Sequence, residues 1–249
     1  MPRPSPTTDL VVCTVPTYTE AENILPLARE LLALGPQFVV LVIDDHSPDG
    51  TWRLVEEAAK SEPRLHLLHR TTDKGRGRAG RDGFVRALEL GASTVIEMDA
   101  DHSHQPRYIP VMIERLNRRG EQVGLVLGSR GVLGGRDAHR GLFRQLLTRC
   151  ANLYIRMMLG VTVRDCNSGF RCWRAETLRA IDVAKTFSPG PAIVQELLFK
   201  TAQRKIGIAE VPIEFHNRLH GQSTLTLRIL LQGYTAVLKL RWLALTGRI

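Results

Sequence analysis

Apolar and polar residues recur along the first half of the chain in a regular pattern. Short, mainly apolar segments at residues 9–15, 38–43, 64–69 and 94–98, of which 38–43 is continuously apolar, are each followed by a polar loop and then by a stretch with helical periodicity. Short runs without polar alternation are typical of parallel strands that are covered on both faces. The pattern predicts an α/β fold with a mostly parallel central sheet flanked by helices.

The pattern becomes less regular after a fifth predicted strand at residues 123–127. A long helical segment follows at 142–159, and another strand is predicted at 206–215. Pro212 lacks a backbone N–H, so it predicts an edge position or a bulge for this last strand. We interpret residues 9–224 as one domain, preceded by a disordered tail at 1–8.

The last predicted unit, residues 225–249, is apolar but carries charges through its middle and end. A membrane-spanning helix needs about 20 predominantly apolar residues, so we predict no transmembrane span. Its polar residues recur at helical spacing and predict one polar stripe on an amphipathic helix: Arg228, Gln232, Thr235 and Lys239. Such a helix either lies on a membrane surface or covers the core, and the arginine-rich helix at 142–159 has the same two interpretations.

The polar loop after residues 94–98 carries two carboxylates one position apart, Asp99 and Asp101. Alternate side chains of an extended chain point the same way, so both carboxylates can face one hard cation that prefers oxygen ligands. Asp, Ser and a following Pro106 are equally typical of a turn that caps a helix. The two residues alone leave both interpretations open.

Two other polar loops are predicted at the same edge of the sheet. They follow the first and second strands, at residues 16–18 and 44–45. In doubly wound sheets, ligands bind outside the carboxyl ends of the strands. The pattern therefore predicts one site, built from these two loops together with residues 99–101.

Composition narrows the class of ligand. The chain has 249 residues, of which 43% are hydrophobic, and its net charge is +9, which suits an anionic partner such as nucleic acid, nucleotide phosphate or an acidic membrane surface. Nucleic acid is disfavoured because the basic residues are scattered and only 6% of residues are aromatic.

The four cysteines lack metal-ligand spacing and are interpreted as reduced thiols. The first residues contain no apolar signal segment, so we expect a cytoplasmic protein.

Residues 75–80 match the dinucleotide-binding pattern G-x-G-x-x-G at the start of a predicted helix. That pattern belongs in the first βα turn, where this chain has Pro16 to Glu20 and no glycine. We therefore interpret the glycines as a turn that another backbone segment approaches closely.

Six motifs in their order and spacing resemble the dolichol-phosphate mannose synthase family, which are glycosyltransferases of family 2 with the GT-A (Rossmann-like) fold. They are Val-Pro-Thr-Tyr-Thr-Glu (15–20), Asp-Asp-His-Ser-Pro-Asp-Gly-Thr (44–51), Met-Asp-Ala-Asp-His-Ser-His-Gln-Pro (98–106), Gly-Ser-Arg (128–130), Asp-Cys-Asn-Ser-Gly-Phe-Arg (165–171) and Glu-Val-Pro-Ile-Glu-Phe-His-Asn-Arg-Leu-His-Gly-Gln-Ser (210–223). The resemblance implies an enzyme that moves mannose from GDP-mannose to a polyprenyl phosphate with inversion. It also implies a Mg²⁺ or Mn²⁺ cofactor and peripheral association with the cytoplasmic face of a membrane.

The resemblance also implies roles for individual residues. Metal binding falls to Asp101 and Ser103, the acceptor phosphate to Arg144 and Thr148, and catalysis to Asp99, Asp101 and Arg130. The residues implied to bind the donor are Pro16, Tyr18, Glu20, Ile43, Asp45, Asp99, Ala100, Asp101, Arg130 and Arg218.

The chain departs from the family at position 224, where threonine replaces a lysine commonly found six residues after the arginine at 218. This change removes a cation expected near the donor diphosphate. Two alternatives therefore stay open: a transferase for another nucleotide sugar such as UDP-glucose, and a nucleotide-sugar-binding protein without turnover.

Overall fold

The computed structural model describes residues 9–137, 142–216 and 227–246, except for the side chains of 142–144 and 227–232. The strands are β1 (Val11–Thr17), β2 (Phe38–Asp44), β3 (Leu65–His69), β4 (Thr94–Glu97), β5 (Val123–Ser129), β6 (Arg136–Asp137), β7 (Arg171–Arg174), β8 (Gly207–Pro212) and β9 (Glu214–Phe215). The α-helices are α1 (Ile24–Leu32), α2 (Thr51–Ala59), α3 (Arg76–Glu89), α4 (Ile109–Leu116), α5 (Leu142–Leu159), α6 (Ala175–Ala180), α7 (Ile193–Gln203) and α8 (Leu227–Leu245).

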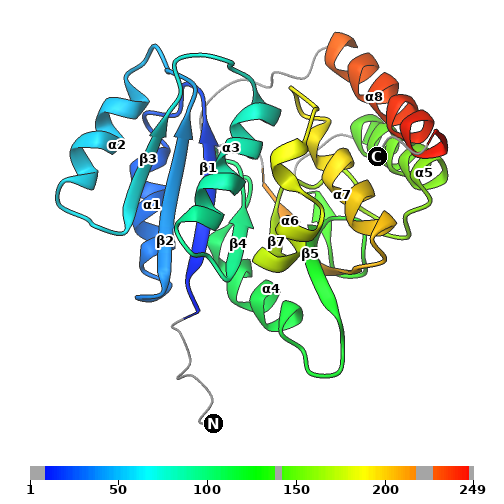
Figure 1. The fold of residues 1–249 in the computed structure, drawn as a ribbon, viewed down its shortest axis with the longest axis horizontal. Coiled ribbons are helices and arrows are strands. Elements are labelled where there is room, and N and C mark those ends of the chain that lie inside the picture. Colours follow the sequence, from blue (N-terminus) through cyan, green and yellow to red (C-terminus); the bar gives the residue numbers. More distant parts are fainter. Residues whose placement is uncertain (1–8, 138–141, 217–226, 247–249) are drawn as a thin grey trace.

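A seven-stranded sheet in the order β3-β2-β1-β4-β7-β5-β8 forms the centre of the molecule (Figure 1). Its neighbouring strands are parallel except for β7, which runs antiparallel between β4 and β5. The predicted mostly parallel α/β sheet is confirmed. Strand β7 was not predicted, because its residues Arg171–Arg174 have no apolar alternation. Strand β8 lies at the edge, as Pro212 predicted.

Helices cover both faces of the sheet because alternate strand residues point to opposite sides. On β1, Val12 faces the layer that contains α3 and α7, whereas Val11 and Cys13 face the layer of α1, α2 and α4. Both sets of side chains are fully or almost fully buried. The strand order changes direction at β1, which lies between β2 and β4, so the polar loops at the carboxyl ends of these strands meet at a topological switch point.

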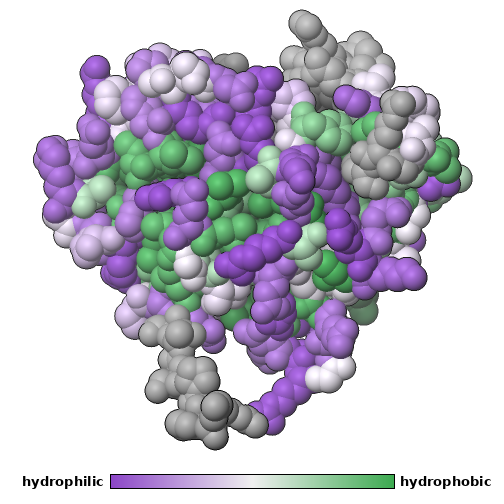
Figure 2. Space-filling model, in the orientation of Figure 1, coloured by the Kyte–Doolittle hydropathy of each residue, from purple (hydrophilic) through white to green (hydrophobic). Residues whose placement is uncertain are grey.

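Helices α5 and α8 lie side by side at one end of the sheet (Figure 1). The Tyr154 and Tyr234 rings are 4.9 Å apart, and Val237 and Leu240 of α8 are buried in the core. One stripe of α8 therefore packs against the core. Other apolar side chains of the two helices are exposed: Leu146, Leu147, Leu153, Met157, Tyr234, Leu238, Trp242 and Leu245. Figure 2 shows hydrophobic surface in this region next to hydrophilic side chains.

None of the described helices combines the length and the hydrophobicity needed to cross a membrane.

Candidate active site

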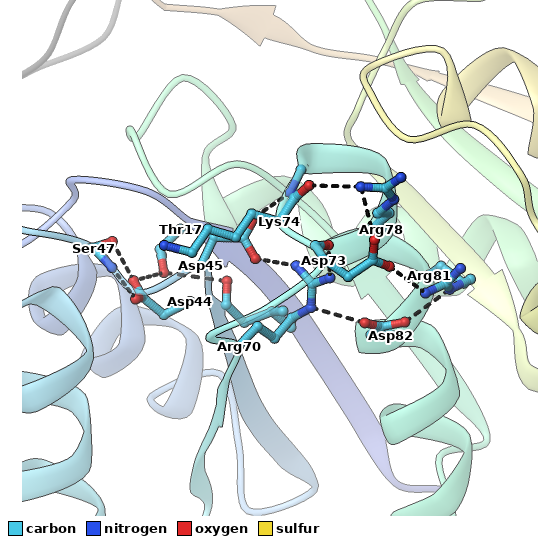
Figure 3. Close-up of polar contacts among 12 residues, drawn as sticks. Thr17, Asp44, Asp45, Ser47, Arg70, Asp73, Lys74, Arg78, Arg81 and Asp82 are labelled. Atoms are coloured by element: carbon cyan, nitrogen blue, oxygen red, sulfur yellow. Dashed lines mark hydrogen bonds and ion pairs between the residues drawn. The ribbon is translucent and has the colours of Figure 1, made fainter.

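The loops after β1 and β2 are joined through a buried carboxylate, Asp44. One of its oxygens accepts hydrogen bonds from the hydroxyls of Thr17 (2.7 Å) and Ser47 (2.6 Å), and the other accepts the Ser47 backbone N–H at 2.8 Å (Figure 3). Ser47 in turn accepts the backbone N–H of Thr19 at 3.0 Å. These bonds hold the two loops together, so Asp44 has a structural role at the edge of the site.

Asp45 follows Asp44 in sequence and has different partners. Its Oδ1 forms an ion pair with Nη1 of Arg70, which comes directly after β3, and its Oδ2 accepts the Gly75 backbone N–H at 2.7 Å. Both Asp45 and Arg70 are buried. Sequence reasoning missed Arg70, although its position at the carboxyl end of a parallel strand was a signal that it lies at this edge.

The Asp-x-Asp loop forms a tight turn around Asp101. The Asp101 Oδ1 accepts the hydroxyl of Ser103 at 2.6 Å and its backbone N–H at 3.1 Å, and both residues are buried. The turn interpretation of this loop is thus correct in part. The same bonds also place a carboxylate and a hydroxyl together, and two hard oxygen donors fit Mg²⁺ or Mn²⁺. Among the described residues, no cluster of three or more His, Cys, Asp or Glu side chains offers a complete protein cage for a metal ion.

Asp99 contacts two other side chains, those of Arg76 and His104. Its Oδ1 lies 3.3 Å from Nη2 of Arg76, which also lies 3.4 Å from the buried Glu97 of β4. Its backbone N–H donates to Nδ1 of His104 at 3.1 Å. Asp99 thus has a cationic partner that the resemblance did not imply.

His104 packs beneath the Asp-x-Asp turn, stacked on Phe170 with ring centroids 5.1 Å apart. Burial lowers its pKa, against the opposing effect of the Asp99 and Asp101 charges. Since Nδ1 accepts a hydrogen bond, the neutral ring carries its proton on Nε2. His104 thus fixes the backbone that presents both carboxylates.

Arg130, at the end of β5, is held in a bidentate ion pair. Its Nε and Nη2 lie 2.7 and 2.9 Å from the two carboxylate oxygens of Asp165, and its guanidinium lies 5.0 Å from the Phe215 ring centre. Burial opposes ionisation of Asp165, but the positive charge of Arg130 and its hydrogen bonds outweigh burial and lower the Asp165 pKa. Glu210 of β8 fixes the same segment by accepting the Asp165 backbone N–H at 3.1 Å.

A cleft of about 630 Å³ opens beside this ion pair. One helical face of α5 forms one wall, through Gln145, Thr148, Arg149, Asn152, Leu153 and Arg156. Its lining is strongly basic, with Arg130, Arg136, Arg149, Arg156 and Arg164 against Asp137 and Asp165. Arginine forks are suited to phosphate oxygens, so the cleft is electrostatically matched to an anionic phosphate.

A chain of side-chain amides lies between this cleft and α7. Gln195 Nε2 donates to Asn167 at 2.6 Å, and Asn167 Nδ2 donates to Asn152 of α5 at 2.8 Å. The motif at 165–171 is thereby tied to both helices, so the loop that carries Asp165 has a defined position.

The glycines at 75–80 serve close packing. A Cβ on Gly77 would lie 2.1 Å from the carbonyl oxygen of Ser188, and the Gly77 N–H donates to the Pro189 carbonyl at 3.0 Å. This agrees with the interpretation of the glycines as a site of close backbone approach.

Comparisons with known proteins identify the family. Residues 13–181 match the family described as "Glycosyl transferase family 2". A Micrococcus luteus protein named undecaprenyl-phosphate mannosyltransferase is 38% identical over 96% of this chain and 98% of its own length. The chain belongs to glycosyltransferase family 2. A second relative in the family, the polyprenol monophosphomannose synthase of Mycolicibacterium smegmatis, is 36% identical over 85% of this chain and 79% of that protein.

Solved structures confirm the GT-A fold of this family 2 chain. A glucosyl-3-phosphoglycerate synthase from Mycobacterium tuberculosis, crystallised with Mn²⁺, UDP-glucose and phosphoglyceric acid, matches with a TM-score of 0.69 at 20% identity. The match covers 98% of this chain and 86% of that one. At this identity the likeness concerns the fold alone.

The structure brings most of the family-implied donor residues to one edge. Pro16 and Glu20 are partly buried there, and Tyr18 is 59% exposed. The Ile43 side chain is fully buried on β2 and would contact a Cβ placed on Gly83, and a role of Ile43 in donor binding stays a prediction. Ala100 is likewise buried, between the two carboxylates.

The family-implied acceptor residues are described in part. Thr148 lines the basic cleft. Arg144 lies in the first turn of α5, but its side chain is outside the described part of the structure, as are Arg218 and Thr224 altogether. Sequence reasoning did not place Arg136 and Arg164 in this cleft, because Arg136 lies in the short strand β6 and Arg164 in a loop, with no helical periodicity to link them to α5.

Replacing Asp165 tests the ion pair as a structural element of this family 2 fold. Asp165→Asn leaves Arg130 buried without its charge partner, so we expect a loss of about 3 kcal/mol or more in the free energy of unfolding at pH 7. The Asp165 pKa is lowered by folding, so its contribution is complete above the unfolded-state value of about 3.9 and is lost as pH falls through the lower folded-state value. Urea unfolding should show a constant gap between wild type and variant from pH 7 to about 5 that narrows below about pH 4. A gap that widens on acidification would contradict the account.

Proposed function

We propose that this family 2 enzyme transfers mannose from GDP-mannose to a polyprenyl phosphate, inverts the anomeric centre, and depends on Mg²⁺ or Mn²⁺. The names of its relatives support mannose and a polyprenyl phosphate as substrates. The observation that carries the proposal is the arginine-lined cleft that adjoins the end of β5 at the Asp-x-Asp edge of the sheet. It provides a phosphate site separate from the nucleotide loops, as a phosphate acceptor requires.

On the donor side, Asp45 would accept N–H groups of the base and Asp99 would contact sugar hydroxyls. Asp101 and Ser103 would hold the divalent cation, which supplies charge neutralisation at the leaving diphosphate when it is bound. Mn²⁺ in crystals of the mycobacterial synthase supports this cofactor class. The bonds of Asp101 to the Ser103 hydroxyl and backbone keep these oxygens in place without substrate.

On the acceptor side, an oxygen of the phosphate monoester would be the nucleophile. Its second pKa is about 6, so at neutral pH it is largely dianionic and needs no strong general base. The larger obstacle is repulsion between two anionic substrates. The arginines of the cleft offset it by placing positive charge around the acceptor phosphate before it approaches the donor.

The prenyl chain is too long for a protein of this size to enclose. A second cavity of about 640 Å³ lies between α5, α8 and the 187–192 segment, and apolar groups of Ala151, Ile155, Ala236 and Val237 contribute to its lining. We propose that the first isoprene units, or the bilayer surface, meet the protein along these helices. Their exposed apolar side chains and intervening arginines suit the interface of an anionic cytoplasmic membrane leaflet.

A transfer assay tests the function and its metal site together. With labelled GDP-mannose, a polyprenyl phosphate and Mn²⁺, we expect wild-type protein to form organic-extractable label. Asp101→Asn removes a proposed cation ligand, so we expect transfer to fall by at least about 100-fold and calorimetry to show no metal-dependent donor binding. The matched control is Asp182→Asn, which removes a surface carboxylate paired with Lys185 and should leave transfer unchanged.

Other outcomes of this assay decide between the alternatives. Label transferred from UDP-glucose but not from GDP-mannose would identify a different polyprenyl-phosphate glycosyltransferase. Metal-dependent donor binding without any lipid-linked product would identify a binding protein without turnover, as the threonine at position 224 keeps open. Asp101→Asn with wild-type metal dependence would refute the metal assignment.

Membrane association is tested by flotation with liposomes of phosphatidylcholine and phosphatidylglycerol. Met157 is 76% exposed on α5 and Leu238 is 51% exposed on α8. Burying each such side chain in lipid contributes about 1.5–3 kcal/mol, so the double variant Met157→Ser/Leu238→Ser should reduce the bound-to-free ratio by about tenfold or more. Leu54→Ser/Val111→Ser changes similarly exposed residues of α2 and α4 and should not alter binding. Equal losses in both double variants would refute a specific membrane face.

A further inference from the structure

The glycine-rich turn and the arginine after β3 have no part in the proposed transfer chemistry, yet both bind Asp45. Arg70 Nη1 is paired with one oxygen of Asp45, and the Gly75 N–H lies 2.7 Å from the other. A carboxylate group has about four lone-pair sites, two on each oxygen. One site on each oxygen is thus occupied inside the protein, which fixes the plane of the carboxylate.

Arg70 is itself fixed from three directions (Figure 3). Besides Nη1 on Asp45, its Nε donates to Asp82 of α3 at 2.9 Å and its Nη2 donates to the Asp73 carbonyl at 2.6 Å. Arg70 is buried, so these partners replace water at one N–H each of Nε, Nη1 and Nη2. Because the group is planar and rigid, the position of Asp82 determines the direction in which Nη1 faces Asp45.

Asp82 belongs to a series of alternating charges on α3 and the turn before it. Its second oxygen accepts Arg81 Nε at 2.9 Å, and Asp73 pairs with Arg78 at 2.9 Å and with Arg81 at 3.6 Å (Figure 3). The side chain of Asp82 is 33% exposed, so a substitution there is compatible with folding. The series connects the first turns of α3 to the loop that carries Asp45.

We propose that Asp82, acting through Arg70, is a positioning residue that orients the Asp45 carboxylate for recognition of a guanine base. The proposal rests on the proposed function, in which Asp45 contacts the base of the donor. With one lone pair of each oxygen already used, each oxygen keeps one lone pair as an acceptor for a ligand. Guanine has two adjacent donors, N1–H and the N2 amino group, which match this pair. Uracil offers one N–H between two carbonyl oxygens and matches it less well.

The proposal predicts a selectivity that binding measurements can isolate. GDP and IDP differ only in the N2 amino group of the base, so their affinity ratio reports the second hydrogen bond to Asp45. With Mg²⁺ present, we expect wild-type protein to prefer GDP in calorimetry. Asp82→Asn should reduce the GDP-to-IDP affinity ratio by about fivefold or more, the usual discrimination from a bidentate base contact. Arg70→Lys should do the same, because one ammonium group cannot replace the three-way fork.

Two control variants separate positioning from general damage to α3. Asp82→Glu keeps a carboxylate and should retain most of the ratio. Glu89→Gln removes a charge from the exposed Arg86–Glu89 pair on the same helix and should leave the ratio unchanged. If Asp82→Asn weakens GDP and IDP by the same factor, or leaves both unchanged, the positioning role is refuted. If wild type binds UDP in preference to GDP, the proposed donor is refuted instead.

Discussion

Several charged side chains lie close together, with little water, at the edge of the sheet where the parallel strands end. Ion pairs between separate elements stabilise these charges. Asp45 is paired with Arg70, Asp99 with Arg76, and Asp165 with Arg130. Each pair joins two segments that are distant in sequence. A buried charge without a partner is costly, so these pairs determine which side chains can stand at the site.

Pairing also changes how Arg130 is understood. The resemblance implied that Arg130 binds the donor and takes part in catalysis, and the structure adds that its guanidinium is engaged with Asp165. Arg130 still contributes positive potential to the cleft. We propose that the acceptor phosphate is contacted directly by those cleft arginines that are not held in a bidentate ion pair. Arg164 is one of them: its side chain is exposed and its backbone N–H is fixed by Glu210 at 2.9 Å.

Periodicity predicted the α/β class, the edge strand at Pro212 and the meeting of three loops, because continuous apolar runs report parallel strands directly. Motif spacing predicted the family. The sequence did not reveal β7, the basic cleft or the partners of Asp45 and Asp99, since these depend on contacts between segments far apart along the chain.

Binding of a soluble acceptor analogue tests the central claim, that the arginine-lined cleft is the phosphate site, most directly. In calorimetric titration with farnesyl phosphate, Arg164→Gln should weaken binding by about tenfold or more, as expected for loss of a charge-assisted hydrogen bond. Arg179→Gln, which removes an exposed arginine from α6, should bind like wild type. Equal affinity of wild type and Arg164→Gln, or equal weakening in both variants, would contradict the assignment of the cleft.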